Sequence, residues 1–102
     1  MNGEIDAQSL LSRLSGPNPP LVVDVRQPQE VQAEGAITGS LLIPLNELPA
    51  RLGEVPADRD IVTVCKRGQR SFNAAVWLRQ MGRHATSLQG GLDQWKALKL
   101  PL

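Results

Sequence analysis

The stretch of sequence that most constrains the fold is Ile61-Val62-Thr63-Val64-Cys65-Lys66-Arg67-Gly68-Gln69-Arg70-Ser71. Its first four residues lack the polar alternation of a half-exposed strand, so they predict a strand covered on both faces, as in a parallel sheet. A helix is then predicted from about Arg70 or Ser71 to Met81, and the positions expected to face the sheet are Ala74, Ala75, Leu78 and Met81. Because a helix follows a buried strand, the segment indicates an α/β fold.

The rest of the chain repeats this alternation of strands and short helices. A second buried strand is predicted at residues 21–25, and shorter strands at 4–5, 85–88 and just before Pro44. Further helices are expected after the N-cap residue Asp6 and at 27–34, 45–52 and 92–98. We interpret residues 16–20 as a turn, because the segment before them is too short to be a domain. The expected architecture is a single α/β domain over residues 1–102 with a mainly parallel sheet.

Composition argues against several functional classes. The 102 residues carry 11 Lys or Arg and 10 Asp or Glu, with two Trp, one Phe and no Tyr, so no nucleic-acid partner is expected. One Cys cannot form an internal disulfide, and with a single His we expect neither a metal site nor a Ser-His-Asp triad. The N-terminus lacks the pattern of a signal peptide, and no run approaches the ~18 apolar residues of a membrane span. We expect a soluble, cytoplasmic domain with no membrane partner.

Cys65 lies where several features favour an anion. It follows the carboxyl end of a predicted parallel strand, which is the edge at which open α/β sheets bind ligands. The next helix begins shortly afterwards, so its free N–H groups and its dipole would face the sulfur. Lys66, Arg67 and Arg70 add positive charge, and Gly68 permits the positive φ of an anion-binding nest. The pattern predicts a nucleophilic thiolate at the base of a cationic, amide-lined cup.

The loop from Cys65 to Ser71 resembles the active-site loop of the rhodanese family, which reads Cys, two residues, Gly, one residue, Arg, then Ser or Thr. Further matches at the family's usual spacing are Asp24-Val25-Arg26, Glu30, Gly35, Ile37, Gly39 and Ile43-Pro44, followed later by Gly90-Gly91, Trp95 and Leu100-Pro101. The resemblance therefore spans nearly the whole chain. One departure is Ala36, where the family commonly has His. That His is not the family's nucleophile, so the departure concerns local hydrogen bonding more than activity.

The resemblance implies a five-stranded, mainly parallel sheet with helices on both faces, and it implies transfer of sulfane sulfur. Cys65 would attack the outer sulfur of thiosulfate or a similar small anionic donor, releasing sulfite and leaving a Cys65 persulfide. Cyanide or a thiol, including a thiol carried by a protein, would then take the sulfur in a ping-pong reaction. No cofactor is implied beyond this covalent persulfide.

The resemblance also implies roles for the residues that follow Cys65. Binding of the donor anion is expected from Lys66, Arg67, Gly68, Gln69, Arg70 and Ser71. Arg70 and the loop amides would hold the donor and the persulfide, while Lys66 and Arg67 would steer anions towards the loop. Ser71 would either hydrogen-bond the sulfur or cap the helix.

Asp24 and Arg26 are expected to support the loop. Asp24 ends a predicted parallel strand, so it should lie near the same sheet edge as Cys65. We favour a structural role, in which Asp24 bonds loop amides and orients Arg26 towards Glu30.

Two other functions fit the same loop. Cys-dependent phosphatases and arsenate reductases of related folds also cradle an oxyanion, but their Arg lies one position further from the Cys than Arg70 lies from Cys65. The shorter loop suits a persulfide sulfur better than a phosphoryl group. The other alternative is a non-enzymatic rhodanese-like sulfur carrier or interaction module, although inactive versions often lack the Cys that this chain retains.

Overall fold

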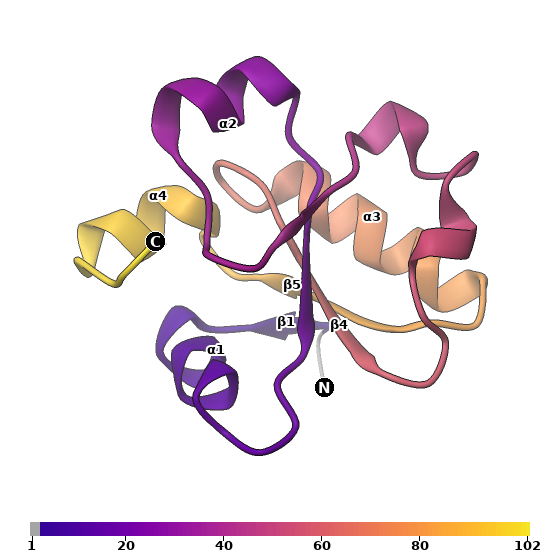
Figure 1. Cartoon of the computed structure of the whole chain (residues 1–102), viewed down its shortest axis with the longest axis horizontal. Coiled ribbons are helices and arrows are strands. Elements are labelled where there is room, and N and C mark those ends of the chain that lie inside the picture. Colours follow the sequence, from indigo (N-terminus) through magenta and orange to yellow (C-terminus); the bar gives the residue numbers. More distant parts are fainter. Residues whose placement is uncertain (1–2) are drawn as a thin grey trace.

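Five strands form the central sheet of the computed structural model, which describes residues 3–102 (Figure 1). The strands are β1 (Glu4–Ile5), β2 (Leu21–Asp24), β3 (Leu41–Leu42), β4 (Asp60–Val64) and β5 (His84–Leu88). Their order across the sheet is β1-β5-β4-β2-β3, and each neighbouring pair is parallel. The predicted α/β fold with a mainly parallel sheet is therefore confirmed.

Helices cover both faces of this sheet. The described residues form α1 (Ala7–Leu14), α2 (Pro28–Glu34), α3 (Gln69–Gln80) and α4 (Gly91–Ala97). The core on the α3 side consists of Val23, Val25, Ile43, Leu48, Val55, Ile61, Cys65, Ala74, Ala75, Leu78 and Ala85. The core under α1 and α4 consists of Ala7, Leu10, Val22, Ile37, Val62, Val64, Leu88, Leu92 and Trp95. Because neighbours such as Val22 and Val23 enter different cores, the strands need apolar residues on both faces.

Met81 and the segment 45–52 differ from the expected pattern. α3 ends at Gln80, so Met81 is the C-cap residue and is 40% exposed instead of facing the sheet. In place of one helix at 45–52, the chain forms two 3-10 helices, η1 (Leu45–Glu47) and η2 (Leu52–Glu54). Pro49 lies between them, and proline has no N–H with which to continue a helix.

The carboxyl edge of the sheet brings together segments that are distant in the sequence. Asp24, the last residue of β2, is in register with Val64, the last residue of β4, and Cys65 follows directly. The expectation that Asp24 and Cys65 share one sheet edge is therefore confirmed. α2 lies beyond this edge in Figure 1, and α3 begins shortly after Cys65. Within residues 3–102, no helix is long and apolar enough to cross a membrane.

Candidate active site

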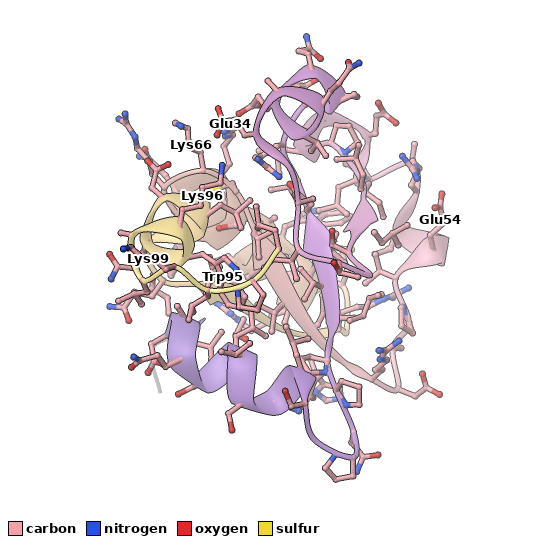
Figure 2. The ribbon with its side chains drawn as sticks, turned by 60° about the vertical axis from the view of Figure 1, so that its left-hand side comes forward. Glu34, Glu54, Lys66, Trp95, Lys96 and Lys99 are labelled. Carbon is pink, nitrogen blue, oxygen red and sulfur yellow. The ribbon has the colours of Figure 1, made fainter. Side chains whose placement is uncertain are left out.

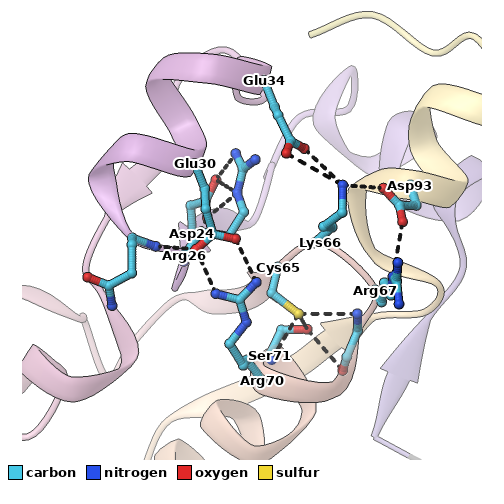
Figure 3. A network of polar contacts seen from close by, with 12 residues as sticks. Asp24, Arg26, Glu30, Glu34, Cys65, Lys66, Arg67, Arg70, Ser71 and Asp93 are labelled. Carbon is cyan, nitrogen blue, oxygen red and sulfur yellow. Dashed lines mark hydrogen bonds and ion pairs between the residues drawn. The ribbon is translucent and has the colours of Figure 1, made fainter.

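Cys65 Sγ is held by groups at the start of α3 (Figure 3). It accepts the N–H of Gly68 at 3.1 Å and the N–H of Ser71 at 3.3 Å. It also lies 3.3 Å from Ser71 Oγ. The residue is only 1% exposed, so the sulfur lies at the base of the loop. Two N–H groups directed at one sulfur favour negative charge on it.

Gly68 makes the turn that directs these amides at the sulfur. It is the N-cap of α3, and its φ of 102° lies in the left-handed region that residues with a Cβ rarely adopt. A Cβ at this position would lie 3.4 Å from Gly90 N and 3.5 Å from Leu88 O, so the turn also packs closely against the end of β5. The geometry around Cys65 therefore depends on glycine at this position.

Two buried hydroxyl groups lie behind the sulfur. Ser71 Oγ is 2.8 Å from Ser87 Oγ, and it donates to Gly68 O at 3.2 Å. Both serines are fully buried. Because Gly68 is the N-cap of α3, Ser71 does not cap the helix, and its hydroxyl lies beside the sulfur instead. Sequence reasoning missed Ser87. In the parallel register Ser87 lies opposite Thr63, and the Thr63 hydroxyl donates to Ser71 O at 2.7 Å.

Arg70 is bound to Glu30 of α2. Its Nη1 and Nη2 atoms donate to the two carboxylate oxygens, each at 2.8 Å. These hydrogen bonds lower the pKa of Glu30 from 4.5 to about 2, so the carboxylate is ionised at neutral pH. The same hydrogen bonds raise the pKa of Arg70 above its usual value. The positive charge of Arg70 is therefore balanced by a carboxylate, and its binding of a donor anion stays a prediction.

Lys66 and Arg67 are also paired with carboxylates. Lys66 Nζ lies 3.2 Å from Glu34 and 3.3 Å from Asp93, and the hydrogen bond to Glu34 raises the pKa of Lys66. Arg67 lies 3.5 Å from Asp93, and its side chain is 80% exposed. Lys96 approaches Glu34 at 3.7 Å, and Figure 2 shows Glu34, Lys66 and Lys96 together between α2 and α4. The loop that looks cationic in the sequence is thus surrounded by carboxylates that pair with its positive side chains.

Asp24 and Arg26 form a buried ion pair beside α2. Arg26 Nη2 donates to Asp24 Oδ2 at 2.7 Å, and the two side chains are 0% and 1% exposed. Arg26 also donates its backbone N–H to Asp24 at 3.1 Å and Nη2 to Gly35 O at 2.8 Å. Its side chain is therefore bonded to the end of α2, whereas Glu30 bonds Arg70. Arg26 still lies near enough to Glu30 for its positive charge to help lower the pKa of that carboxyl, although its hydrogen bonds go to Asp24 and Gly35. The pair therefore attaches the end of α2 to the sheet edge.

Gly91 supports the loop from the side of α4. Leu92 N donates to Cys65 O and Asp93 N donates to Lys66 O, each at 2.9 Å. Gly91 has a φ of +62°, and a Cβ there would lie 2.4 Å from Lys66 O. The start of α4 therefore packs backbone against backbone on the loop, which only glycine permits.

A hollow of about 260 Å³ lies over the sulfur, and it is lined by Cys65, Lys66, Arg67, Gln69 and Arg70. The structure thus gathers the predicted loop residues around one opening, with Gly68 and Ser71 bonded to the sulfur. Among residues 3–102, no group of three or more His, Cys, Asp or Glu side chains could hold a metal ion. The arrangement offers a sulfur nucleophile, N–H donors directed at it and room for a small molecule, which are the requirements of covalent group transfer.

Comparison with known proteins finds relatives along nearly the whole chain. Residues 6–98 match the family model of the rhodanese-like domain. A sulfurtransferase of Allochromatium vinosum is 40% identical, over 100% of this chain and 95% of the relative. The thiosulfate sulfurtransferase GlpE of Stutzerimonas stutzeri is 31% identical, over 74% of this chain and 70% of the relative. The crystal structure of a rhodanese-related protein from Thermoplasma volcanium is 30% identical, with a TM-score of 0.88 over 96% of this chain and 94% of that one.

Proposed function

Because the chain belongs to the rhodanese-like domain family, we propose that it is a sulfurtransferase in which Cys65 carries the transferred sulfur as a persulfide. The observation that carries this proposal is the pair of N–H groups that Gly68 and Ser71 donate to Cys65 Sγ. The relatives named as sulfurtransferases support the reaction class, and GlpE is named for thiosulfate. Thiosulfate, or a similar small anion, is the donor we propose.

The proposed reaction has two steps. The Cys65 thiolate attacks the outer sulfur of thiosulfate, the S–S bond breaks, and sulfite leaves with the electron pair, so that a persulfide anion remains on Cys65. Cyanide or a thiolate, including one on a protein, then attacks the terminal sulfur and displaces Cys65 as a thiolate. Each leaving group departs as an anion, so neither step requires a general acid. In this scheme the only covalent intermediate is the persulfide, and no cofactor takes part.

The loop supplies the binding groups for both steps. The N–H groups of Gly68 and Ser71 stabilise the thiolate before the reaction and the persulfide after it. The Ser71 hydroxyl accepts the hydrogen bond of the Cys65 thiol and donates to the sulfur once the thiol has lost its proton. Because Cys65 is 1% exposed, a donor must present a terminal sulfur at the base of the hollow. Lys66 and Arg67 lie at the rim, where their charges favour the approach of anions.

The test is an assay of thiocyanate formation from thiosulfate and cyanide, run beside hydrolysis of an aryl phosphate. We expect turnover of thiosulfate by the wild type and none by Cys65→Ser, whose fold should be retained because the two side chains are nearly equal in size. Hydrolysis of the aryl phosphate without sulfur transfer would overturn the proposal in favour of a phosphatase. Inactivity in both assays would favour a non-enzymatic module.

A further inference from the structure

We propose, on the basis of the proposed function, that Glu30 tunes the charge selectivity of the donor site: it lowers the efficiency of doubly charged sulfane-sulfur donors such as thiosulfate relative to singly charged ones. Glu30 acts through Arg70, so it is a specificity-determining positioning residue and does not contact the reacting sulfur itself. The inference rests on the geometry of this pair and on the charges that surround the hollow.

Glu30 accepts hydrogen bonds from two of the N–H groups of Arg70. A guanidinium has five N–H groups, and one on each terminal nitrogen is used by Glu30, each at 2.8 Å. The two side chains are 26% and 38% exposed, so the bidentate pair is partly shielded from solvent. Arg70 therefore keeps N–H groups with which to bind a donor, but its positive charge is already compensated by a carboxylate.

The other cations around the hollow are compensated in the same way. Lys66 lies within 3.5 Å of both Glu34 and Asp93, and Arg67 lies 3.5 Å from Asp93. The site thus offers hydrogen-bond donors without a large excess of positive charge. A dianion that enters the hollow places twice the charge of a monoanion near the Glu30 carboxylate, and the repulsion grows in proportion.

Glu30 keeps its negative charge throughout the range in which such an enzyme would be assayed. The hydrogen bonds from Arg70 hold the pKa of Glu30 at about 2, far below neutrality. The discrimination between donors should therefore be the same at every pH from 5 to 8.

Thiosulfate and methanethiosulfonate form a matched pair of probes for this proposal. Methanethiosulfonate has a methyl group in place of one anionic oxygen, so it carries one negative charge instead of two. With either donor, Cys65 takes the outer sulfur as the S–S bond breaks, and sulfite or methanesulfinate leaves with the electron pair. In a ping-pong reaction the donor's kcat/KM does not depend on the acceptor. The readout is therefore the ratio of kcat/KM for thiosulfate to kcat/KM for methanethiosulfonate, measured at low ionic strength.

Glu30→Gln should raise this ratio about tenfold, because the negative charge that is hydrogen-bonded to Arg70 at the hollow is removed. Glu30→Asp retains the charge and should return the ratio most of the way to the wild-type value. Glu54→Gln is the matched control, since Glu54 forms a similar bidentate pair with Arg51, at 2.8 and 3.0 Å. Figure 2 shows Glu54 on the opposite side of the molecule from Lys66, so this variant should leave the ratio unchanged.

Two results would overturn the inference while leaving the proposed function intact. One is an unchanged ratio in Glu30→Gln; an equal loss of kcat/KM with both donors would further mean that Glu30 only holds Arg70 in place. The other is an equal rise of the ratio in Glu54→Gln, which would assign the effect to overall charge. By contrast, a wild-type chain that takes sulfur from neither donor would overturn the proposed function and this inference together.

Discussion

Replacing Gly91 by Ala should displace the loop that carries Cys65. The new Cβ would lie 2.4 Å from Lys66 O, 2.6 Å from Lys66 C and 2.7 Å from Arg67 N, all of which are backbone atoms. No rotation of a side chain can relieve these contacts, so the loop and the start of α4 must move apart.

The magnitude follows from three costs. A residue with a Cβ in the left-handed region costs about 1–2 kcal/mol, and Gly91 has a φ of +62°. Separation of the loop from α4 also weakens the two hydrogen bonds from Leu92 N and Asp93 N, each worth about 0.5–1.5 kcal/mol. We therefore expect a loss of roughly 2–5 kcal/mol in the free energy of unfolding. A displacement of about 1 Å at a reacting atom costs on the order of 100-fold in rate.

The assay combines thermal unfolding with kcat/KM for sulfur transfer, and the control is Gly82→Ala. Gly82 has a φ of +81° with no atom within 4 Å of the position of a Cβ, so this variant has the backbone strain without the collision. At about 4–8 °C per kcal/mol for a domain of this size, Gly91→Ala should lower the Tm by at least about 8 °C. Gly82→Ala should lower it less and should leave sulfur transfer unchanged.

The reasoning would be refuted if Gly91→Ala were no more destabilising than Gly82→Ala and retained full activity. That result would mean that the loop is not held by the backbone of α4.

Three further predictions concern the polar contacts around the loop. Ser71→Ala should lower both kcat/KM and the rate of Cys65 alkylation by iodoacetamide about fivefold to tenfold. Ser87→Ala acts only through Ser71, so it should lower both quantities about twofold. A larger effect of Ser87→Ala than of Ser71→Ala would contradict this order. Asp24→Asn removes the charge that compensates the buried Arg26 and should cost about 3–5 kcal/mol in urea unfolding, so a loss below about 1 kcal/mol would disprove the pairing. Because folding lowers the pKa of Glu30 from 4.5 to about 2, its contribution to stability is full above pH 4.5 and is lost as the pH falls to about 2. The stability difference between wild type and Glu30→Gln should therefore be constant from pH 7 to 5 and close towards pH 2, and a difference that persists at pH 2 would exclude ionisation as its cause.

The sheet and the position of Cys65 follow from local patterns. Apart from Asp24 and Thr63, residues 21–25 and 61–64 are apolar without alternation because each strand meets a core on both faces, and this feature indicates a parallel sheet. Parallel strands end at one edge, so the shared location of Asp24 and Cys65 could be inferred from their places at the ends of two strands. The exposed Met81 could not be anticipated in this way, since the apolar spacing continues one residue beyond the end of α3.

The charge balance of the site could not be read from the sequence. The positive residues of the loop are contiguous, but the carboxylates that pair with them lie on α2 and α4. Whether Arg70 or Arg26 bonds Glu30 depends on how α2 docks over the sheet edge, and no local pattern specifies that docking. Ser87 was missed for a similar reason, because its contact with Ser71 exists only once β5 is in register with β4.

The most direct test of the central claim is the intact mass of the chain after incubation with thiosulfate and removal of excess donor. We expect the addition of one sulfur atom to the wild type, its location on Cys65 by peptide mapping, and its complete removal by cyanide. Cys65→Ser should gain no sulfur under the same conditions. A wild-type mass that does not change, or a sulfur that is added equally to Cys65→Ser, would contradict the assignment of Cys65 as the carrier of the transferred sulfur.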